Sequence, residues 1–347
     1  GTTVAGCTAR THSTGDEPTP EETTTEPTST PTETEPTTTP TGATSTETTE
    51  STPSKWENEL HKGETHLEAA IGEFTEEATA AEPTILDVTA ATTGFSRIDV
   101  HEELRLAKRY LGRAKEFGSS GIADEATELL TVTDYLETLG FAQLHLVNSY
   151  LAVEHTLQSI YLEKYDDIDD DLGDIDFQQS RAGEYATSIR EGFDESTVSV
   201  VDVITGSQFT AKLDQIDTER ATLADIATHL DGLKEPFEVF EEQVQLYRSM
   251  QYDSVDFYSS VRGFEAVQEG LASITPASSL TPVLDELTCL FDAFLAGTSE
   301  MQEAVRARQN SEHQVARDYE GNAVTAYKAC NALVEEVKPV TDLVETM

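Results

Sequence analysis

The chain has 347 residues, and its 66 acidic against 22 basic side chains give a formal net charge of −44. Because phosphates and anionic lipid headgroups repel such a chain, the charge disfavours nucleic acid and bare membrane surfaces as partners. At molar salt the Debye length falls to about 3 Å, which screens the self-repulsion of an acidic domain, so the composition predicts a protein that is soluble at high salt.

An apolar residue, two small residues and a cysteine follow one another at Val4-Ala5-Gly6-Cys7. This order resembles the lipobox of secreted prokaryotic lipoproteins, and residues 1–7 resemble the remnant of a signal peptide with its cleavage site. The resemblance implies cleavage before Cys7, a lipid on the Cys7 sulfur and a protein held at the extracellular face of the cytoplasmic membrane. The membrane is then a partner that the chain reaches through this lipid.

A low-complexity segment follows at residues 8–55. It holds 20 threonines and seven prolines among its 48 residues, and its only apolar side chains are Ala9 and Ala43. Such a composition buries too little surface to offset the entropy of ordering, and it is typical of O-glycosylated stalks. At the polyproline II rise of about 3.1 Å per residue the segment spans up to roughly 150 Å. We interpret it as a disordered spacer between the anchor and a domain; the alternative is a disordered tail without a role.

The composition changes at Trp56, where the remaining 292 residues begin. They carry 57 acidic and 20 basic residues, a net charge of −37 that is spread along their whole length. This pattern resembles the proteins of extreme halophiles, especially haloarchaea. The length suits one large domain or two small ones, and a boundary between two would fall near residues 195–207.

Apolar residues recur at spacings of three and four through most of residues 56–347, and only five prolines interrupt them. This period indicates helices. We expect them over residues 60–74, 104–117, 129–161, 165–193, 208–233, 236–250, 253–273, 281–308 and 312–337. Two segments differ from this pattern. The Thr-rich segment 84–95 predicts a long loop, and the β-branched segment 198–204 predicts a short strand.

The segment from Tyr247 to Tyr258 resembles the hinge of a tetratricopeptide repeat. Tyr247, Tyr252 and Val255 echo its two aromatics and the small residue that follows, whereas Met250 stands where that repeat has glycine. Residues 161–168 echo the hinge more loosely, and no 34-residue period continues along the chain. We therefore expect an all-α array of antiparallel helix hairpins, either a helical bundle or a solenoid similar to these repeats.

If Cys7 carries a lipid, Cys289 and Cys330 remain as an even pair in an oxidising compartment. A helix-to-helix turn at residues 306–314 would bring the two cysteines to the same height of an antiparallel hairpin, with Asn310 or Ser311 capping the second helix. A turn at residues 297–299 would leave them out of register. The sequence leaves open whether they form a disulfide, which requires Cα atoms about 4.4–6.8 Å apart.

No arrangement of residues in the sequence indicates catalysis. The seven aspartates of segment 166–176 suit either a hard cation such as calcium or a solvated acidic helix face, and we favour the acidic face. The eight histidines lack metal-ligand spacing, and no phosphate-binding glycine loop or nucleophile motif occurs. The sequence therefore predicts a protein that is not an enzyme and that has no metal site and no cofactor.

Six of the 20 basic residues after Trp56 lie between Arg97 and Lys115. Arg105, Arg109 and Arg113 are spaced four residues apart and form a stripe on one side of the predicted helix. Two interpretations remain open: acidic side chains of neighbouring helices neutralise the stripe, or the stripe binds an acidic protein or an anionic glycan.

Together these features predict a lipid-anchored extracellular protein of a halophile. Its helical domain would act as a non-catalytic binding or scaffolding module, with a protein or glycan partner at the cell surface and no nucleic acid. The alternative functions are a ligand-capturing lipoprotein of a transport system and a hydrolase whose active residues are dispersed along the sequence.

Overall fold

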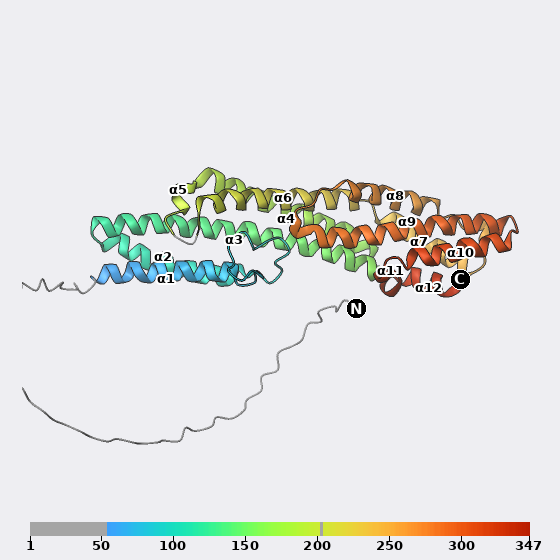
Figure 1. Cartoon of the computed structure of the whole chain (residues 1–347), viewed down its shortest axis with the longest axis horizontal. Coiled ribbons are helices and arrows are strands. Elements are labelled where there is room, and N and C mark those ends of the chain that lie inside the picture. Colours follow the sequence, from blue (N-terminus) through green and yellow to red (C-terminus); the bar gives the residue numbers. More distant parts are fainter. Residues whose placement is uncertain (1–53, 202–203) are drawn as a thin grey trace, which may run out of the picture. The chain divides into compact units, whose positions relative to one another are not determined.

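The computed structural model describes residues 54–201 and 204–347, which belong to one compact unit from Thr52 to Met347 (Figure 1). Cys7 and the segment 8–53, which hold the expected anchor and all but the last two residues of the expected stalk 8–55, lie outside the described residues; Ser54 and Lys55 instead belong to the start of the first helix. Within the described part, the fold is all-α, with twelve α-helices, two short 3-10 helices and no strand. The expected fold class is thus confirmed as a helical bundle.

The first four helices follow the apolar periodicity closely. They are α1 (Lys55–Thr75), α2 (Arg97–Phe117), α3 (Ser120–Tyr161) and α4 (Tyr165–Gly192). Ser54 begins α1 with a capping box, because its hydroxyl accepts a bond of 3.2 Å from the backbone N–H of Glu57. Each helix packs against the next along the chain, so that α2 lies between α1 and α3.

The second half of the chain begins with α5 (Glu195–Val198) and α6 (Gly206–Leu230). A pair formed by α7 (Lys234–Arg248) and α8 (Tyr258–Ser273) follows, with the 3-10 helix η1 (Tyr252–Ser254) between them. The 3-10 helix η2 (Ser278–Leu280) leads into α9 (Thr281–Gln309), and α10 (His313–Tyr327) folds back along α9. The chain ends with α11 (Asn331–Glu336) and α12 (Lys338–Thr346).

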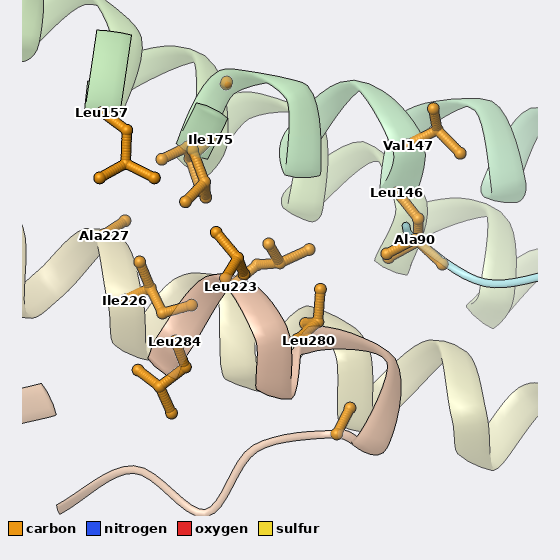
Figure 2. Close-up of a cluster of buried hydrophobic side chains, with 14 of the residues drawn as sticks. Ala90, Leu146, Val147, Leu157, Ile175, Leu223, Ile226, Ala227, Leu280 and Leu284 are labelled. Atoms are coloured by element: carbon orange, nitrogen blue, oxygen red, sulfur yellow. The ribbon is translucent and has the colours of Figure 1, made fainter. Parts of the chain in front are cut away.

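One continuous apolar core joins the two halves. Figure 2 shows side chains of α6 facing those of α3 and α4, with the start of α9 packed beside them; the labelled residues include Leu157, Ile175, Leu223, Ile226, Ala227, Leu280 and Leu284. Further along, α7, α8 and α9 enclose an aromatic cluster in which the rings of Phe264 and Phe294 have centroids 4.8 Å apart. Helix α6 packs against both α4 and α8. The part of the chain before residue 195 and the part after residue 207 therefore belong to the same apolar core.

The short strand expected at residues 198–204 is not formed in the described part of that segment, and this prediction was wrong. Val198 is instead the last residue of α5. The side chain of Asp194 accepts a bond of 2.9 Å from the backbone N–H of Thr197 and so caps this helical turn. Val198 and Ile204, at the two ends of the β-branched run, are both buried in the helical core, whereas Val200 is exposed.

The single helix expected at residues 312–337 is divided into α10 and α11, so this prediction was also wrong. The backbone of Cys330 is extended, with φ −112° and ψ 105°. The break redirects the C-terminal residues, so that α11 contacts α9 and α12 contacts α7, where Arg248 and Asp342 form an ion pair of 2.5 Å. A straight helix would have continued along α9 without reaching α7.

The turn that precedes α10 lies at residues 310–312, inside the segment 306–314. The alternative turn at residues 297–299 is excluded, because these residues lie within α9. Asn310 ends α9 and Glu312 begins α10 without a side-chain cap, so the expected cap by Asn310 or Ser311 is absent. Ser311 instead adopts a left-handed backbone conformation with φ 62°.

In the segment that resembles a tetratricopeptide hinge, Tyr247 and Tyr252 pack edge to face with ring centroids 5.2 Å apart. Met250 has φ 57°, the left-handed conformation that favours glycine and that explains why glycine is usual there. Tyr252 belongs to η1, and α8 begins six residues later at Tyr258.

Candidate functional site

The arginine stripe lies on the solvent side of α2. Leu104 and Leu111 are 1% and 0% exposed, and the small residues Ala107 and Ala114 on the same face are also buried. The 3.6-residue period therefore turns positions 105, 109 and 113 outward, and all three arginines are exposed.

Neighbouring helices neutralise only part of this basic region. The ammonium group of Lys108 lies 2.6 Å from a carboxylate oxygen of Asp134 and 2.5 Å from one of Glu137, both on α3. Although burial lowers the pKa of Lys108, hydrogen bonds to these two carboxylates outweigh it, and the pKa is raised. On the other side of α2, Arg113 lies 3.3 Å from Glu59 of α1.

Arg105 and Arg109 form no ion pair with any carboxylate of the described residues. The guanidinium of Arg109 lies 6.0 Å from the ring centroid of Tyr110, at the outer limit of a cation–π contact. The structure therefore divides the three predicted site residues: Arg113 is paired within the protein, whereas Arg105 and Arg109 present unpaired positive charge to solvent.

Large apolar side chains lie near both ends of this face. Ile98 is 67% exposed near the start of α2, and Phe117 is 52% exposed at its end, where it stacks on Trp56 with ring centroids 5.1 Å apart. Two exposed acidic residues of α2, Glu102 and Glu116, lie on its solvent side as well. We name the surface formed by Ile98, Arg105, Arg109 and Phe117 the α2 face.

A second polar arrangement, whose residues were not expected from the sequence, lies in the core where α6 packs against α3. Lys212 of α6 is 0% exposed, and its ammonium group donates to the carbonyl of Val88, to Gln143 Oε1 at 2.9 Å and to Gln215 Oε1 at 3.4 Å. All three ammonium protons thus have acceptors. Burial lowers the pKa of Lys212 to about 8, and the charges of Glu219 and Asp87 offset part of that effect.

Glu219 lies two turns further along α6 and is 1% exposed. Its carboxylate accepts a backbone N–H of Ala90 at 3.0 Å, the amide of Gln215 at 3.2 Å and the hydroxyl of Ser279 at 2.7 Å. Gln143 donates to the carbonyl of Thr89 at 2.7 Å. We call the group of Lys212, Gln143, Gln215 and Glu219 the Lys212 network. Its side chains form hydrogen bonds with buried backbone groups of the long loop that the sequence predicted at 84–95.

A signal for this network exists in the sequence. Phe209, Leu213, Ile216 and Leu223 mark the buried stripe of α6 at spacings of three, four and seven. Positions 212 and 219 fall on the same stripe but carry charges, and a charged residue in the core requires buried partners. The partners themselves, on α3 and in the loop, are not indicated by any local pattern.

Cys289 and Cys330 are both free thiols in the structure, with Cys289 exposed and Cys330 buried. Their side chains are neighbours, and burial together with the influence of the nearby Cys289 thiol raises the pKa of Cys330 to about 12. The register of the α9–α10 hairpin agrees, because Asn322 donates to Glu300 at 3.1 Å and Tyr327 meets Thr298 at 3.1 Å. The structure thus brings the two cysteines together without a bond between them.

The aspartate-rich segment forms the first turns of α4. Asp166 pairs with Lys234, and Asp171 accepts a bond of 2.9 Å from the hydroxyl of Ser159. Among the described residues, no group of three or more potential ligands is arranged to hold a metal ion. The same residues include no helix with the length and apolar character needed to cross a membrane.

Comparisons with protein-family models, with curated proteins and with solved structures give no match to this chain.

Proposed function

We propose that this chain is a lipid-anchored protein of the outer cell surface, whose helical domain binds an acidic partner through the α2 face without catalysing a reaction. The order Val4–Cys7 and the Thr-rich segment behind it support the anchor and the spacer. The partner is an acidic protein or an anionic glycan at the cell surface.

The observation that carries the proposal is the unpaired charge of Arg105 and Arg109. After Trp56 acidic residues outnumber basic ones by 57 to 20, yet Arg105 and Arg109, one helical turn apart on the same side of α2, have no carboxylate partner among the described residues. Arginine and aromatic side chains are also enriched at the centres of protein interfaces. On α2 the two arginines lie between the exposed Ile98, seven positions before Arg105, and the exposed Phe117, eight positions after Arg109, with Glu102 and Glu116 on the same side.

High salt is compatible with such an interface. A Debye length of about 3 Å at molar salt removes long-range attraction, but a guanidinium in direct contact with a carboxylate is closer than that length. Specific contact would therefore persist at molar salt, while non-specific attraction between this acidic protein and its surroundings would not.

The Lys212 network supports the absence of catalysis. Lys212 and Glu219 are the most deeply buried charged groups that the structure describes, and such groups often mark active sites. Here, however, both bond to groups of the protein itself, which accounts for their burial by a role in holding the loop. This arrangement favours a binding module over the hydrolase alternative.

The binding test compares the wild-type protein with the double variant Arg105→Glu, Arg109→Glu. A matched control, Arg317→Glu with Lys328→Glu, makes the same change of charge at two exposed positions on and just after α10. Each full-length protein is immobilised and exposed to detergent-solubilised envelope in molar KCl, and bound components are quantified by mass spectrometry. We expect an acidic component that the wild type and the control retain and the α2 variant loses; equal retention by all three proteins would refute the proposed site.

The anchor is tested separately. Mass analysis of the mature N-terminus of the native protein should find Cys7 as the first residue and carrying a lipid. An unmodified Cys7 would remove the anchoring part of the proposal and would leave the binding part standing.

A further inference from the structure

A polar hollow of about 600 Å³ lies between the C-terminal part of α9 and the segment that connects α7 to α8. Gln302, Arg306 and Gln309 of α9 form one wall, at spacings that place them on the same side of the helix. Asp253, Asp256 and Tyr258 contribute to the opposite wall. The volume is in the range of small-molecule sites, and the hollow does not overlap the α2 face.

The two glutamines are held in fixed orientations. Gln302 Oε1 accepts the backbone N–H of Phe257 at 2.6 Å, and Gln309 Nε2 donates to the carbonyl of Tyr252 at 2.8 Å. Each amide is thus fixed through one of its two polar ends. Among the described residues, neither the amino group of Gln302 nor the carbonyl of Gln309 has a further partner, so the wall offers one donor and one acceptor to a ligand.

The remaining lining adds groups of both kinds. Arg306 lies between the two glutamines and donates to Glu303 at 2.5 Å, which leaves further guanidinium N–H groups for a ligand. On the facing wall, one carboxylate oxygen of Asp256 accepts the backbone N–H of Tyr258 at 3.0 Å. Tyr258 is 49% exposed, and the guanidinium of Arg262 lies over one face of its ring at 5.1 Å from the centroid, so the other face is the one that a ligand can contact.

This combination selects a class of ligand. Each hydroxyl group donates and accepts hydrogen bonds, so a ligand with adjacent hydroxyls matches a wall that offers both donors and an acceptor. The two aspartates disfavour an anion, because the only arginine among the lining residues is paired with Glu303. The apolar face of a sugar ring matches the exposed face of Tyr258. We propose that this hollow binds a neutral sugar unit of a glycan.

Salt distinguishes this site from the α2 face. Hydrogen bonds and ring contacts with a neutral ligand involve no long-range charge attraction, so the affinity should change little between about 1 M and 3 M KCl. The proposal does not depend on the acidic partner of α2, and the two sites are tested with different variants and different probes.

The experiment uses saturation-transfer NMR and titration calorimetry of the full-length protein with glucose, galactose, mannose and N-acetylglucosamine, and with spermidine as a cationic probe. The site variant is Arg306→Ala with Tyr258→Ala. The control variant is Arg317→Ala with Tyr319→Ala, which removes the same two residue types from α10, outside the hollow. Circular dichroism confirms that both variants are folded.

We expect at least one of the sugars to bind the wild type and the control, and to lose about tenfold or more in affinity in the site variant, as the removal of a charge-assisted hydrogen bond and a ring contact predicts. Binding of none of the sugars would overturn the proposal. Equal sugar binding by the site variant would overturn it too, and binding of spermidine alone would identify the hollow as a cation site instead.

Discussion

Replacing Lys212 by Met tests the physical account of the buried network most directly. Methionine keeps the length of the side chain but removes its charge and its three hydrogen-bond donors. The lost donors leave Oε1 of Gln143 and Oε1 of Gln215 without their partner, at a cost of about 1–3 kcal/mol each, whereas the carbonyl of Val88 keeps a bond of 3.3 Å from Nε2 of Gln215. The substitution also removes the free-energy cost of burying the charged ammonium group away from water. Its pKa falls from 10.5 to about 8, which corresponds to about 3 kcal/mol at neutral pH.

These two terms have opposite signs and similar sizes, so the variant should lose only about 0–3 kcal/mol of unfolding free energy at pH 7. The pH dependence is the sharper test. The folded protein releases the Lys212 proton near pH 8, whereas the unfolded chain holds it until about pH 10.5. Between these values the unfolded state binds more protons, so the unfolding free energy of the wild type rises with pH.

From pH 8 to pH 10 this term adds about 2 kcal/mol to the wild type and nothing to the variant. The difference between them should therefore widen by that amount. Guanidinium chloride unfolding at constant KCl, followed by circular dichroism at pH 7, 8, 9 and 10, measures it. Titrations of tyrosines are common to both proteins and cancel in the difference.

Lys328→Met, at an exposed lysine, is the control and should show no such widening. A difference between the wild type and Lys212→Met that stays constant or narrows from pH 8 to pH 10 would refute the assignment of a lowered pKa to Lys212.

Two further predictions concern the backbone and the cysteines. Oxidised glutathione should convert Cys289 and Cys330 into a disulfide by thiol–disulfide exchange, with release of two reduced glutathiones, and the closed loop should add up to about 4 kcal/mol to the unfolding free energy. Peptide mapping under non-reducing conditions detects the bond, with Cys330→Ser as control, and two thiols that stay free would contradict the prediction. Gly232→Ala should lower the unfolding free energy by about 1 kcal/mol, because Gly232 has φ 78°, a conformation that alanine rarely adopts. Gly112→Ala should raise the unfolding free energy by about 0.5–1 kcal/mol, because position 112 is inside α2 and no atom lies within 4 Å of a Cβ added there. Denaturation of both variants checks the pair, and equal effects would contradict the backbone argument.

Most helices can be located from the sequence because the evidence for a helix is local. Leu104, Leu111 and their neighbours repeat at helical spacing whatever they contact, and Ser54 and Ser96 cap their helices within three residues. The same holds for the turn before α10, where a run without large apolar residues interrupts the period. Where a segment depends on distant contacts, local reasoning failed: α10 ends at Tyr327 because the following residues reach α9 and α7.

The candidate site shows the same division. The sequence by itself determined that Arg105, Arg109 and Arg113 share one side of a helix, because their spacing matches its period. Only the tertiary structure decided that Glu59, 54 positions before Arg113, neutralises one of them and leaves the other two unpaired.

The Lys212 network and the cysteine pair show the same division between sequence and tertiary structure. The sequence placed Lys212 and Glu219 on an apolar stripe, and Cys289 and Cys330 on a hairpin, but it named no partner for the charges and no distance for the thiols. Glu219 meets Ala90 across 129 positions of the chain, and only the folded packing of α3, α6 and the loop brings such residues into contact. Periodicity fixes which side of a helix a residue occupies, whereas the neighbour on that side is fixed by how the helices pack.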